Sequence, residues 1–203
     1  TETAIFTRRG VERIMRVAFD IAHSRPRKHL TIVTKSNAQR HGMVFWDEIA
    51  GLASHDYKDV TWDKELVDAM TMRMVLRPRT IDTVVATNLH ADILSDLAAA
   101  LAGSLGIAPT ANLDPERRSP SMFEPIHGSA FDITGKGIAN PVASFWTAAM
   151  MLEHLGEKQA GDLLMRAVEQ VCAAGILSPD LGGTATTKEV TNAVVEAVRG
   201  INR

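Results

Sequence analysis

The sequence predicts an α/β fold, because helical and strand-like segments alternate along it. An apolar stripe with the spacing of an α-helix runs through residues 7–23, and a β-branched run follows at residues 30–34. A second helical pattern then occupies residues 41–52. This helix–strand–helix order is typical of α/β proteins, not of all-helical or all-β ones.

The first helix is expected to begin beside Thr7, because a threonine hydroxyl there can accept a hydrogen bond from a free amide of the first turn. The side chains expected to face the core are Val11, Ile14, Met15, Ala18, Ile21 and Ala22 in the first helix and Met43, Trp46 and Ile49 in the second. Further along, we expect a weak strand at 60–62, a helix at 64–75, a short buried strand at 83–86 and a helix around Asp92.

The second half of the chain is expected to be mostly helical. Residues 108–120 are polar and proline-rich, which makes them the best candidate in the pattern for a boundary between domains. Three amphipathic helices follow at about residues 141–155, 158–174 and 187–199. Their apolar faces are expected to pack in a core and not to contact a cofactor.

Composition and charge exclude several classes of protein. The 203 residues are 45% hydrophobic, enough for one large domain or two small ones. A net charge of −2 gives no basic surface for a nucleic acid or a membrane, and the apolar run at 97–108 is too short to span a bilayer. Cys172 is the only cysteine, so we expect no disulfide framework and a reducing, cytoplasmic compartment.

Residues 124–141, EPIHGSAFDITGKGIANP, have neither helical nor strand periodicity. Gly128, Gly135 and Gly137 would let backbone amides approach a ligand closely, and amide-lined concavities suit phosphate oxygens. Asp132 would then accept hydrogen bonds from ribose hydroxyls and repel a 2′-phosphate. A glycine-rich connector without a ligand has the same composition, so the loop alone leaves both interpretations open.

Asp92 and Asp96 are four residues apart in a helical pattern, so both carboxylates project from one face. The apolar residues around them (Ile93, Leu94, Leu97, Ala98 and Leu101) indicate that the acids lie against a core. Two neighbouring carboxylates repel each other unless a proton or a cation lies between them, and Mg²⁺ or Mn²⁺ fits such a pair. Alternatively, the acids occupy the first turns of a helix because the helix dipole favours them there.

Lys35 and Asp68 are two further candidates. Lys35 follows the β-branched strand, and a lysine desolvated in a cleft can act as a base. Asp68 lies in the helical pattern at 64–75. By themselves, the first is as well explained as a solvated charge at a strand end and the second as a surface residue.

Together and in this order, these segments resemble the β-decarboxylating dehydrogenases, which include isopropylmalate, isocitrate, D-malate and tartrate dehydrogenases. The resemblance runs the full length of the chain and is most specific in NLHADILSD and in the glycine-rich loop. The segments FTRRGVERI, SRPRK, TKSN, FWDE, TWDK and ANLDPERRSPSMFEP favour the tartrate/D-malate type.

The resemblance implies roles for these residues. Asp92 and Asp96 would bind Mg²⁺ or Mn²⁺ together with the partner's Asp68, and Lys35 would reach across a homodimer to accept the proton of the substrate hydroxyl. The cofactor would contact Asn37, Glu124, His127, Gly128, Ser129, Ala130, Asp132 and Asn140. NADP-preferring relatives carry a basic residue and a tyrosine in place of Asp132 and Ile133, so the resemblance implies NAD as cofactor. The substrate would be a small 2-hydroxy acid such as tartrate or D-malate, oxidised with or without decarboxylation.

The resemblance also implies an isopropylmalate-dehydrogenase-like fold that lacks its N-terminal portion, including the first strands of the cofactor domain and the arginines that bind substrate carboxylates. Residues 1–103 would belong to the dimerisation and substrate domain, and residues 104–203 to the cofactor-binding domain. A catalytic role for Lys35 and Asp68 would then depend on both subunits.

Two departures from the family pattern leave other functions open. Phe6 stands where the family has a tyrosine that protonates the enolate, and phenylalanine has no proton to give. His90 and Ala91 replace a usual Phe-Gly. The chain therefore belongs to an active dehydrogenase, to a catalytically impaired homologue, or to a dimerisation module of the same fold.

Overall fold

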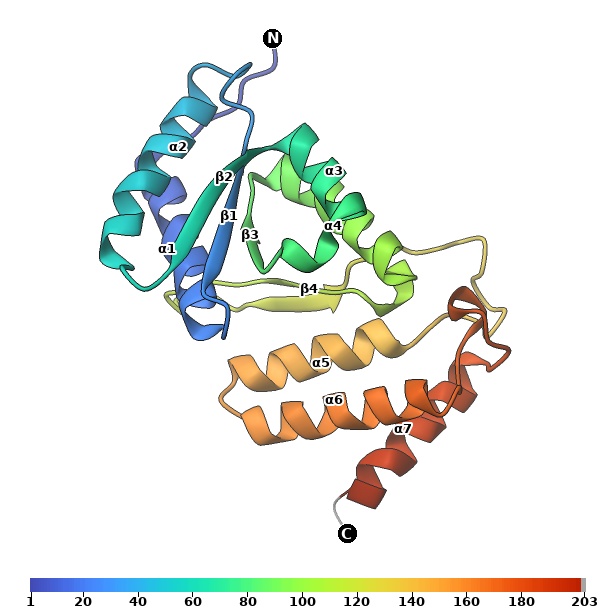
Figure 1. Cartoon of the computed structure of the whole chain (residues 1–203). Helices are drawn as coiled ribbons and strands as arrows, with labels where there is room; N and C mark the ends of the chain where they lie inside the picture. Colours follow the sequence, from blue (N-terminus) through green and yellow to red (C-terminus); the bar gives the residue numbers. More distant parts are fainter. Residues whose placement is uncertain (202–203) are drawn as a thin grey trace. The chain divides into compact units, whose positions relative to one another are not determined.

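The structure is a computed structural model that describes residues 1–201, and the chain divides into two compact units, Thr1–Ala98 and Ala99–Arg203 (Figure 1). The division falls inside one helix, α4 (Asn88–Ala102). The sequence pattern predicted a boundary at residues 108–120, and the family resemblance implied one between residues 103 and 104. The roles expected of the two parts remain predictions.

The first unit is built on a three-stranded parallel sheet in the order β2-β1-β3. Its strands are β1 (His29–Thr34), β2 (Thr61–Leu66) and β3 (Thr83–Val85). Its helices are α1 (Arg8–Ser24), α2 (Gly42–Ala53), α3 (Val67–Leu76) and the first part of α4, with 3₁₀ turns η1 (Ser54–Asp56) and η2 (Pro78–Thr80). The expected α/β class is confirmed.

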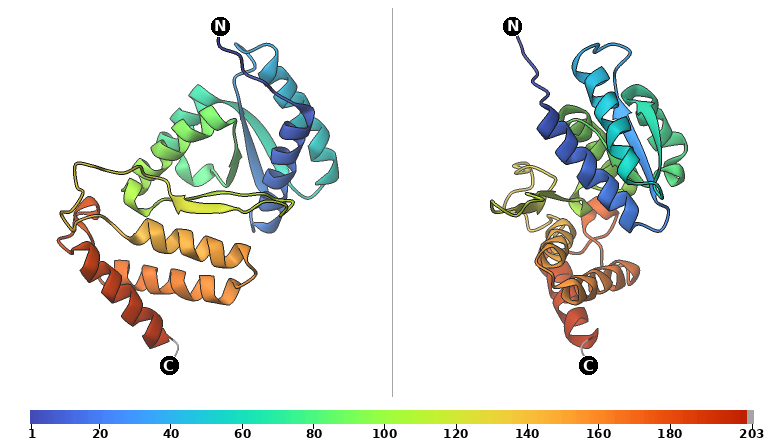
Figure 2. Two further views of the ribbon diagram at one scale, coloured as in Figure 1. Left: turned by 180° about the vertical axis from the view of Figure 1, so that it is seen from behind. Right: turned by 90° about the vertical axis from the view of Figure 1, so that its left-hand side faces the viewer.

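Helices cover both faces of this sheet, with α1 and α2 on one side and α3 and α4 on the other (Figures 1 and 2). Alternate residues of β1 point to opposite faces. Leu30 and Ile32 pack with α1 and α2, whereas Val33 packs with Met70 of α3 and Leu94 of α4. A strand buried on both faces needs this two-sided cover.

Helix α1 begins as expected, since the Thr7 hydroxyl accepts a hydrogen bond from the Gly10 amide at 3.1 Å. Val11, Met15, Ala18 and Ala22 are buried as predicted. The buried residues of the helix also include Phe19, which stacks on Tyr57 with ring centroids 5.0 Å apart. Ile14 and Ile21 are 41% and 46% exposed, so their predicted burial is wrong for this chain.

The expected helix at 64–75 is wrong in its first residues, because Thr61–Leu66 is strand β2, paired with β1 along its whole length. Lys64 and Leu66 are good helix formers, but pairing with a buried neighbour overrides local propensity. Asp63 and Glu65 are two apart and so share one face of the strand, where they bind Arg73.

The second unit contains an antiparallel pair of strands, β4 (Pro109–Asn112) and β5 (Met122–Pro125), in the region that we expected to be only a connection. These strands are four residues long and each has a proline at one end, so they carry almost no sequence pattern. Glu124 therefore lies on a strand, and the loop begins after it.

Helices α5 (Val142–His154), α6 (Lys158–Ala173) and α7 (Thr187–Ile201) confirm the three predicted helices (Figure 2). Helix α5 packs against both strands and α6, and α6 packs against α7. The core of this unit consists of Val142, Ala167, Val168, Val171, Val190 and Val194. The 3₁₀ turns η3 (Leu105–Ile107) and η4 (Pro179–Leu181) complete it. Among residues 1–201, no helix is long and apolar enough to cross a membrane.

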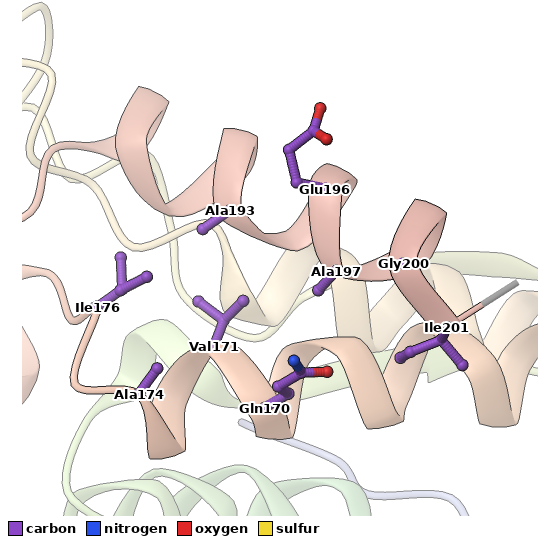
Figure 3. Close-up of a pocket in the computed structure, with 9 residues that line it drawn as sticks. All are labelled: Gln170, Val171, Ala174, Ile176, Ala193, Glu196, Ala197, Gly200 and Ile201. Carbon is purple, nitrogen blue, oxygen red and sulfur yellow. The ribbon is translucent and has the colours of Figure 1, made fainter. Parts of the chain in front are cut away.

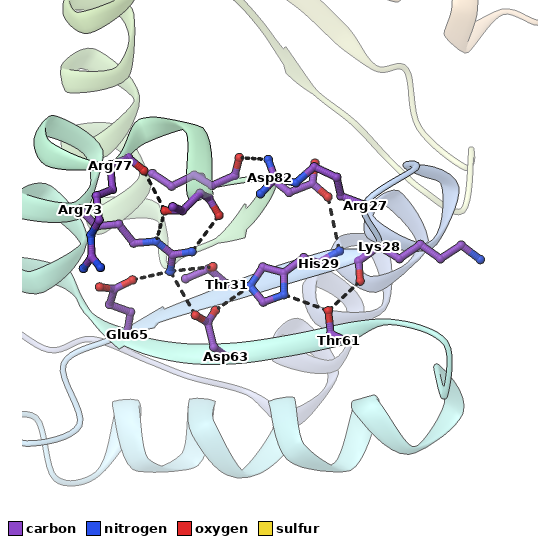
Figure 4. Close-up of polar contacts among 12 residues, drawn as sticks. Arg27, Lys28, His29, Thr31, Thr61, Asp63, Glu65, Arg73, Arg77 and Asp82 are labelled. Atoms are coloured by element: carbon purple, nitrogen blue, oxygen red, sulfur yellow. Dashed lines mark hydrogen bonds and ion pairs between the residues drawn. The ribbon is translucent and has the colours of Figure 1, made fainter.

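Arg73 fastens α3 to the sheet of the first unit (Figure 4). Its side chain is 11% exposed, and its Nη1 lies 2.7 Å from Glu65 and 3.1 Å from Asp63, both on β2. The same nitrogen donates to Thr31 on β1, and Nη2 donates to the carbonyl of Thr80. One guanidinium thus links two strands, a helix and the turn after it.

We predict that Arg73→Ala lowers the free energy of unfolding by about 3 kcal/mol, because it leaves two half-buried carboxylates without their partner. Urea unfolding followed by circular dichroism measures this. Arg8→Ala is the matched control, since the Arg8–Glu12 pair is largely exposed and should contribute less than about 0.5 kcal/mol. Equal effects of the two substitutions would contradict the role given to Arg73.

Candidate functional site

Lys35 and Asp68 form an ion pair at the carboxyl end of the sheet in the first unit. The Lys35 Nζ donates to Asp68 Oδ1 at 2.5 Å. Lys35 directly follows β1, and Asp68 is the second residue of α3, directly after β2. The lysine side chain is 26% exposed and the aspartate 66%, so the pair lies at the surface of this chain.

The hydrogen bond from Lys35, with one from the backbone of Asp68 itself, holds the pKa of the Asp68 carboxyl below its usual value. The carboxylate is therefore ionised throughout the neutral range, as a metal ligand or an ion-pair partner must be. Both residues were candidates from the sequence, and the structure brings them together.

Asp92 and Asp96 lie one turn apart on α4, as predicted, but both are exposed. The expectation that they lie against a core is wrong for this chain: Leu94 is 4% exposed, whereas Ile93 is 53% and Leu101 47% exposed. Within residues 1–201, no three His, Cys, Asp or Glu side chains are close enough to hold a metal ion. Asp68 therefore does not join Asp92 and Asp96 within one chain.

His90, two residues before Asp92, is 8% exposed, and its Nδ1 has no hydrogen-bond partner among the described residues. Burial, assisted by the charge of Lys35, lowers the pKa of its imidazole. The ring is therefore neutral near pH 7, and it occupies the place where the family pattern has phenylalanine.

Phe6 packs against the core beneath α1 and α2. Its ring lies directly over Gly42, where an added Cβ atom would come within 2.6 Å of two ring carbons. The side chain thus has a packing role at the start of α2, and it carries no acid.

The second unit contains a cavity of about 710 Å³ around the glycine-rich loop. Its walls come from three places: the turn η3, the loop after β5, and the segment from η4 to the start of α7. The lining residues are Ser104, Leu105, Gly106, His127, Gly128, Ser129, Ala130, Ile133, Thr134, Gly135, Gly137, Ile138, Ala139, Asn140, Asp180 and Thr187.

Most of the residues expected to contact a cofactor meet at this cavity. His127, Gly128, Ser129, Ala130 and Asn140 all line it. Glu124 on β5 and Asp132 in the loop belong to the same unit, but both are exposed and neither lines the cavity. Asn37 belongs to the first unit, in the turn after Lys35.

The loop is shaped by two glycines and held by α7. Gly135 and Gly137 have φ angles of 75° and 66°, a conformation that other residues rarely adopt. Thr187, the first residue of α7, donates its backbone N–H to the Gly137 carbonyl at 2.8 Å and its hydroxyl to the Ala139 carbonyl at 2.5 Å. The loop is thus anchored although it belongs to no sheet.

Sequence reasoning missed Asp180, which also lines the cavity. Its carboxylate accepts hydrogen bonds from Ser104, Asn140 and Ser178. Burial raises the pKa of this carboxyl, but the three hydrogen bonds together lower it below its usual value. The only local signal is its place in SPD, a turn-forming segment, and nothing in that segment indicates the distant partners.

A second groove, of about 570 Å³, lies between α6 and α7 (Figure 3). Its floor is mostly apolar, and the Glu196 carboxylate points away from it. The lining residues are Gln170, Val171, Ala174, Ile176, Ala193, Glu196, Ala197, Gly200 and Ile201. The groove brings no acid, base or nucleophile together with a partner, so the loop cavity is the better candidate site.

The family model for isocitrate/isopropylmalate dehydrogenase matches residues 1–195, and the chain belongs to this family. It is 75% identical to a probable tartrate dehydrogenase/decarboxylase of Agrobacterium vitis, covering 100% of this chain and 56% of the relative. It is 49% identical to the D-malate dehydrogenase [decarboxylating] of Escherichia coli K12, covering 97% and 56%.

Among solved structures, isocitrate dehydrogenase from Methylococcus capsulatus superposes with a TM-score of 0.93 at 43% identity, covering 98% of this chain and 59% of that one. The family and the fold expected from the sequence are thus confirmed. The chain spans 56% of the length of these curated relatives, as the resemblance to a C-terminal part implied.

The Lys35–Asp68 pair predicts a pH dependence. The pKa of Asp68 is lower in the folded chain than in the unfolded chain. The pair therefore stabilises the fold fully at a pH above the unfolded-state pKa of about 4, and this stabilisation is lost as the pH falls through the folded-state pKa. A carboxyl titration by NMR should give a pKa for Asp68 below that of an unstructured aspartate. Lys35→Met should raise it toward the ordinary value, whereas Lys58→Met should not; no change in the Lys35 variant would refute the pairing.

Proposed function

We propose that this chain carries the greater part of the active site of an NAD- and divalent-metal-dependent dehydrogenase that oxidises a small 2-hydroxy acid such as tartrate or D-malate. Membership of the family and the relatives at 75% and 49% identity support this class of reaction. The observation that carries the proposal is the loop cavity, where five residues expected at a cofactor converge.

The cavity suits the nucleotide part of NAD. Its volume of about 710 Å³ is in the range of sites for small molecules and cofactors. Backbone groups of the glycine loop border it, and the chain bends sharply at Gly135 and Gly137. The exposed Asp132 lies on this loop and would disfavour the additional phosphate of NADP. When bound, NAD would accept the hydride from the substrate.

Asp92 and Asp96 would hold Mg²⁺ or Mn²⁺. Carboxylates are the hard oxygen ligands that these ions take, and both project from one face of α4. When bound, such an ion would polarise a substrate oxygen and stabilise negative charge on it. Two exposed carboxylates are an incomplete set, so we propose that the partner's Asp68 supplies the third.

Lys35 would accept the proton of the substrate hydroxyl. In this chain Lys35 is the cationic partner of Asp68. An ammonium group has no lone pair, so to act as the base the lysine must first lose its own proton and act as the neutral amine. The proposed site is shared between two subunits, and in it Lys35 and Asp68 act together on the partner's substrate.

A homodimer would also cover apolar surface of the first unit. Helices α3 and α4 pack on each other through Met70, Met74 and Leu94. They nevertheless leave other large apolar side chains exposed: Met72 59%, Val75 54%, Leu76 69%, Leu89 65% and Ile93 53%. Exposed apolar side chains in this number favour a protein contact. We propose a second copy of the chain as the partner, and a cytoplasmic location with no membrane or nucleic-acid partner.

Phe6 favours one alternative, a catalytically impaired homologue. A phenyl ring packed over Gly42 cannot supply the proton that the family tyrosine gives. Oxidation of the hydroxyl would remain, because Lys35 and the metal serve that step, while protonation after decarboxylation would be slow. A purely dimerising role is less well supported, because the acids, the lysine and the loop cavity are all present.

The test of the cofactor is nucleotide binding by calorimetry. We expect the 203-residue chain to bind NADH about tenfold more tightly than NADPH, because Asp132 repels the additional phosphate. Asp132→Lys should reverse this preference. Asp162→Lys, an equal change of charge at an exposed position of α6, should leave it unaltered. Tighter binding of NADPH by the unaltered chain would end the NAD assignment.

The test of the metal site is stabilisation by Mn²⁺. We expect the ion to raise the melting temperature of the chain, and Asp92→Asn to abolish this rise, because a ligand that binds only the folded state stabilises it. Asp56→Asn, which removes only an exposed partner of Arg16, should keep the rise. If Mn²⁺ still stabilises the Asp92 variant, the ion binds elsewhere.

A further inference from the structure

The loop cavity has a charged group at its wall that the proposed reaction does not use. Asp180 lies in η4, far along the chain from the other walls. Its Oδ2 accepts hydrogen bonds from the Ser104 hydroxyl and from Asn140 Nδ2, the latter at 2.9 Å. Its Oδ1 accepts one from the Ser178 hydroxyl at 2.6 Å. A carboxylate that accepts three donors from three segments joins those segments.

Two of the three partners of Asp180 in turn hold backbone at the cavity. The Ser104 hydroxyl accepts a hydrogen bond from the Gly106 N–H at 2.8 Å, and Asn140 Oδ1 accepts one from the Val142 N–H at 2.9 Å. The first contact shapes η3, and the second begins helix α5. Through these two residues, Asp180 is connected to η3 and to the C-terminal end of the glycine-rich loop.

Asp180 as a whole residue is exposed, but its Oδ2 is closely packed against Gly106. A Cβ atom added to Gly106 would lie 2.8 Å from Asp180 Oδ2 and 2.8 Å from the Cβ of Asn140. Ser104 and Asn140 are each 9% exposed, and Ser178 is 1% exposed. Buried donors of this kind need acceptors, and the loss of one leaves them unsatisfied.

The side chain of Asn140 is largely used inside the protein. Its amide oxygen and one amide N–H are both occupied, by Val142 and Asp180. Asn140 therefore has little free hydrogen-bonding capacity for a ligand. We infer that it serves the predicted cofactor site mainly by shaping the cavity.

We propose that Asp180 is a positioning residue, which holds segments 104–106 and 140–142 in place and so keeps the cavity in the shape that a nucleotide requires. The inference rests on the proposed nucleotide role of the cavity. It assigns to Asp180 no contact with the nucleotide itself. Its effect on binding passes through Ser104 and Asn140.

The test combines amide hydrogen exchange in the free chain with calorimetric binding of AMP and NADH. Asp180→Ala should speed exchange in the peptides that contain Gly106 and Val142, and weaken AMP and NADH binding about tenfold, because hydrogen bonds to a charged group are among the stronger ones. Asp180→Asn keeps one amide oxygen as an acceptor and should show a smaller change in both measurements. Asp162→Asn, on the exposed side of α6, is the matched control and should change neither.

A double-variant cycle separates positioning from general destabilisation. If Asp180 acts through Asn140, Asp180→Ala combined with Asn140→Ala should weaken AMP binding no more than the stronger single variant. The melting temperature of each variant is measured in parallel, and exchange outside the two segments should stay unchanged.

Unchanged exchange at Gly106 and Val142 in Asp180→Ala would overturn the proposal, as would faster exchange with unaltered AMP and NADH affinity. If the unaltered chain binds neither AMP nor NADH, the proposed function fails instead. Amide hydrogen exchange in Asp180→Ala would then still show whether Asp180 holds segments 104–106 and 140–142.

Discussion

The parallel pairing of β1 with β2 and β3 is the constraint on which the first unit depends. Five of the six residues of β1 are buried, so helices must cover both faces of the strand. The register also places the ion pair. Thr34 is opposite Leu66. Lys35 directly follows Thr34, and Asp68 is the second residue after Leu66. Because the carboxyl ends of parallel strands share one edge, the lysine and the aspartate meet there. If the register between β1 and β2 slipped by one residue, the two side chains would point to opposite faces of the sheet.

The second unit positions its site differently, because the glycine-rich loop belongs to no sheet. Its conformation depends on a distant residue, Thr187, which holds the carbonyls of Gly137 and Ala139. A local contact ends the loop, where the Val142 N–H donates to Asn140 Oδ1. Without such anchors, a loop this rich in glycine has many conformations to lose when it binds a ligand. Pre-formed walls reduce that entropy cost, which is why an anchored loop suits a binding site better than a free one.

The sequence predicted the features that are local. Helix α1 carries its capping residue and apolar stripe within one segment, and the glycine loop carries its own composition, so both were found. The strands were harder. Lys64 and Glu65 have no strand pattern by themselves, and β2 exists because β1 is beside it. Asp180 is 76 residues from Ser104 and 40 from Asn140, so the contacts that define its role appear only when the chain is folded. The same holds for Asp92 and Asp96, whose spacing was evident but whose exposure was not.

That exposure has a physical consequence for the proposed metal site. Two carboxylates on one exposed helical face bind a divalent cation weakly, because water competes for the ion and supplies the remaining ligands. A third carboxylate and a drier environment would strengthen binding, and neither comes from residues 1–201 of the same chain. The proposed dimer would supply both at once, since the contact that covers Leu89 and Ile93 on α4 would also lie beside Asp92 and Asp96. Metal binding and dimerisation would then be thermodynamically linked, each stabilising the other.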